Sequence, residues 1–418
     1  MLPPLRLLQV RASNYKAFEQ PFELDLAPLT LLFGRNGSGK SALVRLALGL
    51  AEALGGGDSP GLPLRVGDIS LGNSLLGFVH GAVSNGEYGI GATVLGGEGQ
   101  PLHLDVLVRK DPRTTLRLPG QWIERWSLRA GDDELETFSW NRTDKRYNGS
   151  LHPEHAAPAT FAGLLPVSAD GGFHPLVARL RPTPQVIHIG AARGIPGEDF
   201  IVQQPKVTLD VGSTGLHTRR VLGALRTHPR PEILQAIVEM VRACFDFDLR
   251  VEEVAQGPIQ GTILEAKPCG RSTWLPLAEI GTGLSHALPM FVQYALAAHP
   301  GEESPSPSLL ICEEPEAHAH PKIQARIADI ILQTVRSGHC TTLVETHSET
   351  LVLRIRRRIA EGFPPDKVAI YWVDDEQATT QVRRLHLDER GNVEDWPEGW
   401  FDSAMHEVSA IHRALGRL

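Results

Sequence analysis

The chain has 418 residues, of which 42% are hydrophobic and 22% are charged, an ordinary composition for a globular protein. Its formal net charge of −8 argues against wholesale electrostatic capture of nucleic acid, although a local basic patch could still bind it. The four cysteines form no C-x-x-C pair, which argues against a zinc or disulfide framework. No stretch approaches the roughly 18 apolar residues of a membrane span. We therefore expect a soluble, cytoplasmic protein without a membrane partner.

In chain order, apolar periodicity first predicts a β-rich part. The expected elements there are strands over 5–13, 22–26 and 29–33, a helix over 41–54, and antiparallel strands within 88–150. The later part alternates, with strands over 185–190, 262–274, 308–312, 341–345 and 368–373 and helices over 221–247, 284–298, 322–337, 349–361 and 401–418. Strands that alternate with helices around apolar runs indicate a largely parallel sheet.

A complete phosphate-loop motif lies between the strand at 29–33 and the helix at 41–54. Its residues are Gly34, Arg35, Asn36, Gly37, Ser38, Gly39, Lys40 and Ser41. The glycines let successive N–H groups turn toward phosphate oxygens, and the helix adds its positive N-terminal end. In this setting Lys40 should reach the β- and γ-phosphates, and the Ser41 hydroxyl should ligate Mg²⁺. ATP and Mg²⁺ are therefore the predicted cofactors, and a chance glycine turn is the alternative.

A second acidic motif, Glu313-Glu314-Pro315-Glu316, ends another apolar strand. In P-loop enzymes the first carboxylate supports Mg²⁺ and the second polarises the attacking water. Because consecutive residues on a strand point to opposite faces, the strand must end here if both are to serve one site. Pro315 favours such an end, since it removes a ladder donor. A solvated acidic turn is the alternative.

Three segments carry a family resemblance: LLFGRNGSGKS, LLICEEPEAHAHP and TTLVETHSE. Together they resemble ABC-class ATPases of the OLD/RecF/SMC branch, and in particular the small OLD-type ATPases of bacteria and archaea. The opening LLQVRASNYKAFEQPFELDLAPLT resembles their N-terminal strand pair, and WPEGWFDSAMHE resembles the C-terminal signature of a stand-alone subfamily. The middle matches only through IHIGAARGIPGE and GSTGLHTRRVL.

The resemblance implies an α/β fold of the P-loop NTPase class and the ABC ATPase type. Such a fold has a mixed sheet core, an antiparallel β subdomain and a helical or irregular insertion. We expect one composite domain over 1–418, made of an N-terminal lobe (1–150), a variable insertion (151–270) and a C-terminal lobe (271–418). Only about 70 residues follow His347, too few for the TOPRIM nuclease of larger OLD-type proteins.

Carried over residue by residue, the resemblance makes Lys40 and Ser41 the Walker A lysine and magnesium ligand. Glu314 falls on the catalytic glutamate, so the chain should hydrolyse ATP to ADP and phosphate. Glu313 falls where many ABC ATPases have aspartate, and would hold Mg²⁺ through a water molecule. His347 falls on the switch histidine, which contacts the γ-phosphate.

A glycine turn before the helix at 284–298 resembles the family's signature loop. Its candidate residues are Gly281, Gly283 and Ser285, which would contact the γ-phosphate of ATP held by the other subunit. The turn departs from the usual Leu-Ser-Gly-Gly-Gln form, so the residue that replaces the signature serine is open. A plain loop before a helix is the alternative. His80 is the candidate for the role of the Q-loop glutamine.

Two further clusters have alternative interpretations. His318 and His320 suggest either a metal pair or a structural role in a dimer-facing loop. The basic run of Arg354, Arg356, Arg357 and Arg358 lies on a predicted helix. It indicates either contact with nucleic-acid phosphates or a salt-bridged surface.

The signature loop implies a homodimer, or a higher even oligomer, that closes head to tail around two ATP–Mg²⁺. The resemblance suggests a sensor or regulator for a separately encoded effector, such as a nuclease or toxin, in antiviral defence or DNA maintenance. The alternative is a repair ATPase of the RecF kind that acts directly on DNA, so nucleic acid stays an open partner. A transporter motor is disfavoured by the long stretch between Lys40 and Glu313.

Overall fold

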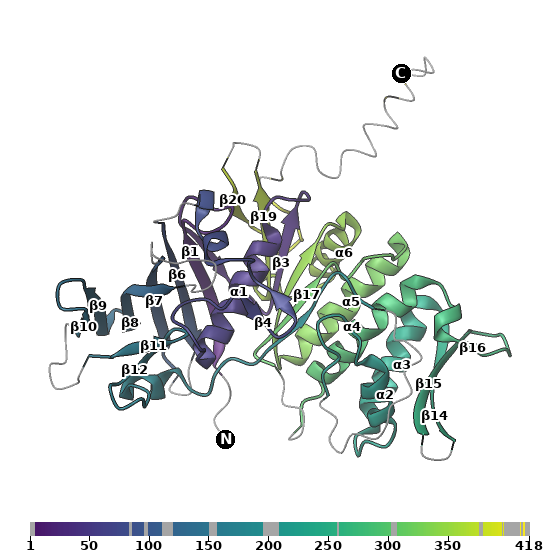
Figure 1. Ribbon diagram of the computed structural model, residues 1–418. Helices are drawn as coiled ribbons and strands as arrows, with labels where there is room; N and C mark the ends of the chain where they lie inside the picture. The colour runs from purple at the N-terminus through teal and green to yellow at the C-terminus, as the bar shows by residue number, and fades with distance from the viewer. Residues whose placement is uncertain are drawn as a thin grey trace.

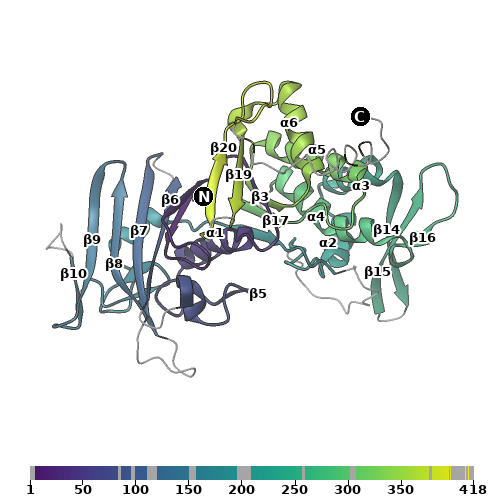
Figure 2. The same cartoon turned by 90° about the horizontal axis from the view of Figure 1, so that it is seen from above.

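A computed structural model gives the fold of the chain. It describes residues 5–82, 86–95, 99–110, 120–149, 157–194, 209–256, 259–301, 307–375, 379–394, 396, 410 and 413. Two large sheets lie on either side of helix α1 (Lys40–Gly55), and further helices cover the far face of the central sheet (Figure 1). The view from above shows α1 between the antiparallel sheet and the central strands (Figure 2). This helix begins at the phosphate loop, so its position fixes the site.

The first sheet is antiparallel, with the strand order β10-β9-β8-β7-β6-β1-β2. Its strands are β1 (Arg6–Ser13), β2 (Phe22–Asp25), β6 (Glu87–Leu95), β7 (Pro101–Lys110), β8 (Gln121–Ala130), β9 (Asp133–Asn141) and β10 (Arg146–Gly149). Strand β7 shows why it forms: Leu102, Leu104, Val106 and Val108 alternate with exposed or half-buried neighbours and face the core. The prediction of antiparallel strands within 88–150 is confirmed.

The central sheet has the order β13-β17-β18-β3-β19-β20 and is parallel except for β20. Its strands are β3 (Leu29–Gly34), β13 (Val186–Ile189), β17 (Leu309–Glu313), β18 (Thr341–Thr346), β19 (Val368–Asp374) and β20 (Gln381–Leu385). Every residue of β3 and β18 is buried, as expected for parallel strands covered on both faces. Strand β18 lies between β3 and β17, so the ends of these three strands meet at one edge.

Five helices are described after the first sheet, and they contribute to the core on the face opposite α1. They are α2 (Thr218–Arg226), α3 (Pro231–Phe245), α4 (Thr282–Ala298), α5 (Pro321–Ser337) and α6 (Glu349–Ala360). The prediction of one helix over 221–247 is wrong. The helix stops before Pro229, and Pro231 starts α3 as its first residue, a position that suits proline because no N–H is needed there.

Smaller elements complete the described chain. A three-stranded sheet contains β14 (Phe247–Gln256), β15 (Ile259–Pro268) and β16 (Leu275–Pro276). The two-stranded pairs are β4 (Arg65–Val66) with β5 (Ile69–Ser70), and β11 (Thr160–Ala162) with β12 (Leu165–Val167). Short 3-10 helices span Leu75–Phe78, His80–Ala82, Pro175–Leu180, Leu277–Glu279 and Pro365–Lys367. The helix expected over 401–418 lies outside the described residues, apart from 410 and 413.

Strand β13 comes from the part of the chain that the sequence predicts to be a variable insertion, yet it pairs in parallel with β17. It therefore forms one edge of the central sheet and reaches the same end as the acidic motif. None of the helices in the described ranges combines the length and apolar character needed to cross a membrane.

Candidate active site

The phosphate loop joins β3 to α1 at the carboxyl ends of the parallel strands. A Cβ on Gly34 would lie 2.2 Å from the Val373 carbonyl oxygen, so only glycine fits there. Gly39 precedes α1 with φ of 101°, and no side chain caps the helix. The first N–H groups of α1 therefore face the loop without a side-chain acceptor, an arrangement suited to phosphate. Arg35, Asn36 and Gly37 are exposed at the tip of the loop, whereas Ser38 is buried.

Lys40 is almost fully buried, with 2% of its surface exposed. Its ammonium donates hydrogen bonds to the carbonyls of Gly34, at 3.0 Å, and Arg35. Burial lowers the pKa of Lys40, and the charges of Glu345 and Glu314 oppose that shift. The ammonium thus faces the inside of the loop, where a phosphate oxygen would give it a charged and stronger acceptor.

Ser41 is the second residue of α1, and its hydroxyl donates to Glu345 Oε1 at 2.8 Å. Glu345 is 4% exposed, and its second oxygen, Oε2, is buried without a hydrogen-bond partner among the described residues. Burial raises the pKa of Glu345 to about 7, Glu313 adds to the increase, and Ser41 opposes it. The sequence analysis missed Glu345. Its signal was an acidic residue inside a strand that is otherwise uncharged and buried.

Glu313 is the last residue of β17 and pairs in register with Glu345 on β18. Its Oε1 lies 2.9 Å from Nε2 of His188, which lies on β13. Burial raises the pKa of Glu313, but His188 first, then Arg45 and the Ala191 N–H, outweigh that effect. The pKa of Glu313 is therefore below its ordinary value, and this carboxylate is held on the β13 side.

Glu314 follows the end of β17 and has φ of 43°, in the left-handed region that glutamate rarely adopts. Its N–H donates to the Glu345 carbonyl at 2.7 Å, and its side chain is 41% exposed. His347 Nε2 lies 3.9 Å from Glu314 Oε1. Burial lowers the pKa of His347, and the Lys40 charge lowers it further, while the Glu314 carboxylate opposes the shift. The strand β17 ends before Pro315, as expected, and the Glu314 side chain that follows it lies next to His347.

Glu316 holds the end of β18 and the backbone of His347. It is 8% exposed, and its Oε1 accepts hydrogen bonds from Thr346 Oγ1 and the His347 N–H, both at 2.8 Å. Ser348 then caps α6, since its hydroxyl accepts from the Leu351 N–H at 2.9 Å. These contacts fix the backbone on both sides of His347, so its imidazole is aimed by the fold.

The candidate signature loop lies at the start of α4. Gly281 is the N-cap residue and Thr282 the first helical residue, and both are exposed. Among the described residues, a Cβ on Gly281 would meet no atom within 4 Å, whereas one on Gly283 would lie 3.1 Å from the His318 carbonyl oxygen. Ser285 is fully buried, and its hydroxyl faces the Leu277 carbonyl at 3.5 Å. The expectation that Ser285 contacts a partner's ATP is therefore corrected: the exposed hydroxyl belongs to Thr282.

Arg193 was not predicted as a site residue. It is 3% exposed, and its Nε donates to the His286 carbonyl of α4 at 2.8 Å. Its two terminal nitrogens donate to the carbonyls of Gly190 at 3.0 Å, Glu313 at 2.9 Å and Glu314 at 2.9 Å. One buried guanidinium thus joins the end of β17 to the start of α4. No local motif marks it, because its acceptors come from distant parts of the chain.

The two histidines after the acidic motif have separate partners. The His318 ring packs against the His286 ring with 4.4 Å between centroids, and His320 caps α5 by accepting from the Lys322 N–H at 3.3 Å. In the described ranges, no group of three or more His, Cys, Asp or Glu side chains is arranged to hold a metal by itself. The structural interpretation of this histidine pair therefore fits the contacts better than a metal pair.

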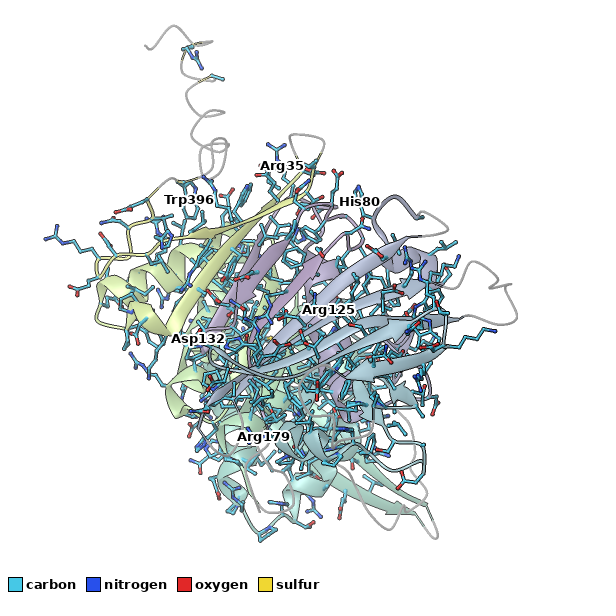
Figure 3. All side chains as sticks on the ribbon, turned by 90° about the vertical axis from the view of Figure 1, so that its left-hand side faces the viewer. Arg35, His80, Arg125, Asp132, Arg179 and Trp396 are labelled. Carbon is cyan, nitrogen blue, oxygen red and sulfur yellow. The ribbon has the colours of Figure 1, made fainter. Side chains whose placement is uncertain are left out.

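His80 lies at the same end of the molecule as Arg35 (Figure 3). Its Nδ1 is 2.9 Å from the Lys16 carbonyl oxygen. The role of the Q-loop glutamine stays a prediction for this residue.

The arginine run on α6 is engaged within the chain. Arg354 and Arg358 both bind Asp329, with shortest distances of 2.7 Å. Arg357 pairs with Glu361 at 2.7 Å, and Arg356 donates to the Gly391 carbonyl at 2.7 Å. The salt-bridged interpretation of this run is confirmed, with Arg356 held by a carbonyl.

Two family models match parts of the sequence. One, described as AAA ATPase domain, matches residues 242–352, which include both acidic residues and the switch histidine. The other, described as Protein of unknown function (DUF3696), matches residues 363–411. No curated protein sequence matches the chain at a significant level.

Among solved structures, three SMC heads are similar to the chain. The SMC head domain from Thermotoga maritima has 11% identity and a TM-score of 0.43, covering 91% of this chain and 99% of that chain. The SmcHead bound to the C-winged helix domain of ScpA has 12% identity and a TM-score of 0.49, with coverages of 92% and 98%. The Smc head bound to the C-terminal domain of ScpA derived from Pyrococcus furiosus has 12% identity and a TM-score of 0.48, with coverages of 98% and 100%.

The chain is an ATPase. It has an α/β fold in which the phosphate loop joins a parallel strand to a helix, with a mixed central sheet and an antiparallel β subdomain. The phosphate loop, the acidic motif and His347, the candidate switch histidine, meet at one edge of that sheet. Its assignment to the OLD-type group stays a prediction.

The donor set at this edge fits Mg²⁺. It offers a serine hydroxyl and two carboxylates in register. One of these carboxylates, Glu345, has a buried oxygen without a hydrogen-bond partner among the described residues. Hard oxygen ligands, supplemented by phosphates and water, are what Mg²⁺ prefers in ATPases.

Proposed function

We propose that two copies of the chain close head to tail around two ATP–Mg²⁺, and that hydrolysis releases them. The observation that carries this proposal is the exposed start of α4. Gly281 and Thr282 are exposed there, and a Cβ on Gly281 would meet no atom of the described part of its own subunit within 4 Å. A glycine turn at a helix N-terminus is suited to an anion. In the proposed dimer this anion is the γ-phosphate held by the partner.

Within one subunit, residues on three strand ends perform the chemistry. The N–H groups of the phosphate loop and the Lys40 ammonium bind the β- and γ-phosphates. Ser41 and the adjacent carboxylates would hold Mg²⁺, which when bound would supply positive charge beside these phosphates. Glu314 is half-exposed beside the loop, where it orients the attacking water, and His347 contacts the γ-phosphate. The start of the partner's α4 adds a fixed positive dipole end as charge develops.

Another protein would bind the closed and open states with different affinity. We propose a sensor or regulator that controls a separately encoded effector, a nuclease or toxin, in bacterial defence or DNA maintenance. The resemblance of the three motifs to OLD-type ATPases supports this role. Direct action on DNA gains no support from the α6 arginines, because three of them form salt bridges with Asp329 or Glu361 and Arg356 donates to a backbone carbonyl.

The Glu314→Gln variant tests the proposal. Glutamine keeps the shape but removes the charge that orients water, so ATP should bind and stay intact. We expect a dimer that forms with ATP and Mg²⁺ and persists, measured by sedimentation velocity. The matched control is Glu314→Gln combined with Lys40→Ala, which should stay monomeric. A Glu314→Gln protein that binds ATP yet stays monomeric at saturation contradicts the dimer.

The same trapped dimer identifies the effector. Tagged Glu314→Gln and tagged Lys40→Ala are expressed in the native host and purified side by side. A protein enriched with the first variant and absent from the second is the expected effector. Equal recovery with both variants would mean that the partner does not read the ATP state.

A further inference from the structure

Two carboxylates lie side by side at the end of the central sheet, but they have different partners. Glu313 and Glu345 are paired in register on neighbouring parallel strands, so their side chains share one face. Glu313 binds His188 at 2.9 Å and the Ala191 N–H, both on the β13 side. Glu345 binds the hydroxyl of Ser41 at 2.8 Å, on the phosphate-loop side.

The strand order explains this division. Strand β18 lies directly beside β3, from which the phosphate loop leaves, whereas β17 is one strand further away. The end of β18 is therefore the acidic position nearest to the start of α1. The carboxylate closest to the Walker A residues thus comes from the strand before the switch histidine.

The two carboxylates also differ in how their charge is compensated. Glu313 has His188 and Arg45 as cationic or donating neighbours and is held in its ionised form. Glu345 is more deeply buried, and its Oε2 has no hydrogen-bond partner among the described residues. A buried charged oxygen without a partner is costly, and a cation beside it removes that cost. The Ser41 hydroxyl donates its hydrogen to Oε1, which leaves its lone pairs for a metal.

We propose that Glu345 is the carboxylate that contacts Mg²⁺ beside Ser41, with Oε2 as the ligand atom, and that Glu313 is a positioning residue held by His188. This inference rests on the proposed ATP–Mg²⁺ site and changes the assignment that the motif order suggests. Glu313 would supply a second carboxylate near the metal. The register of the two strands fixes the position of this carboxylate beside Glu345. The ligand class is a hard divalent cation bound together with triphosphate.

The test measures how much Mg²⁺ increases the affinity for nucleotide, and it does not depend on turnover. A fluorescent ATP analogue is titrated into the full chain with Mg²⁺ and with EDTA. The dissociation constant in EDTA divided by the dissociation constant with Mg²⁺ reports the metal contribution. Glu345→Gln should lower this ratio roughly 100-fold, the loss of a charged ligand, while affinity in EDTA is retained. Glu313→Gln should lower it roughly tenfold, the size expected for an outer-shell partner. Retained binding in EDTA shows that each variant is folded.

A double-mutant cycle separates direct contact from an effect through Ser41. If Glu345 is a ligand, Glu345→Gln still lowers the ratio in a Ser41→Ala background. If it only orients the hydroxyl, the substitution has no effect there, which overturns the inference. A larger loss for Glu313→Gln than for Glu345→Gln also overturns it. A wild-type chain that binds ATP equally with and without Mg²⁺ refutes the ATP–Mg²⁺ site itself.

Discussion

A single negative charge at the start of α4 should prevent the proposed dimer without harming the subunit. Gly281 has φ of −50° and ψ of 145°, a conformation open to any residue, and a Cβ there meets no atom of the residues that the structure describes within 4 Å. Aspartate is a favoured N-cap residue and stabilises a helix by a few tenths of a kcal/mol relative to glycine. Gly281→Asp should therefore fold at least as stably as the wild type. Gly283 is a poorer position, because its Cβ would press against the His318 carbonyl.

The magnitude follows from the charge that the new carboxylate would meet. In the closed dimer it would lie roughly 5 Å from the partner's γ-phosphate. With an effective dielectric constant of about 20, two like unit charges at that distance repel by about 3 kcal/mol. Such a penalty lowers an equilibrium constant by roughly two orders of magnitude. Two-fold symmetry places the same penalty at both sites, so the dimer loses it twice.

The assay places Gly281→Asp in the Glu314→Gln background and measures ATP-dependent dimerisation by sedimentation velocity. Nucleotide affinity of the monomer should be unchanged, and the dimer should be absent. Gly281→Asn is the matched neutral control, since asparagine has the same size and caps a helix equally well. It should dimerise. If the aspartate variant dimerises normally, or if asparagine is as harmful as aspartate, the composite-site argument is refuted.

Two further predictions concern residues away from the loops. Arg193→Met removes the buried donor for four backbone carbonyls and should lower the free energy of unfolding by about 3 kcal/mol, measured by urea denaturation, with Arg193→Lys losing less. A loss as small as that of a surface substitution would contradict this account of Arg193. Asp329→Asn should cost about 1–2 kcal/mol at neutral pH, because the carboxylate binds two arginines. Burial raises the pKa of Asp329, but Arg358 and Arg354 outweigh it, so its folded-state pKa is below its ordinary value. Its stabilising effect is then complete above the unfolded pKa of about 3.9 and lost as pH falls through the folded pKa, and the two proteins should converge in acid-denaturation curves. Curves that stay equally far apart at all pH values would contradict this.

The parts of the site that the sequence predicted are those encoded by neighbouring residues. The phosphate loop is continuous in sequence, and its turn needs glycine at Gly39 because of a positive φ of 101°, a reason local to the backbone. The acidic motif carries its own strand break at Pro315, and the structure ends β17 at Glu313 as expected. Local chemistry was therefore sufficient for both motifs.

The parts that were missed depend on strand order and packing. Glu345 faces Ser41 only because β18 lies between β3 and β17, and no spacing along the chain encodes that order. Ser285 was expected at the surface, but α4 is apolar on most of its circumference and buries that hydroxyl. Arg193 has acceptors on three separate segments, so its role exists only in the folded chain.

Arg193 also links the two halves of the proposed mechanism. Glu314 faces the ATP of its own subunit, while the start of α4 would face the ATP of the partner. The carbonyl of Glu314 and the carbonyl of His286, on α4, bind the same buried guanidinium at 2.9 Å and 2.8 Å. Because a guanidinium is planar and holds its donors in a fixed fork, a shift at one acceptor strains the other. In the proposed dimer, a change in the backbone at Glu314 after hydrolysis would therefore displace the start of α4, which contacts the partner's ATP. The nucleotide state of one site would in this way affect the other site.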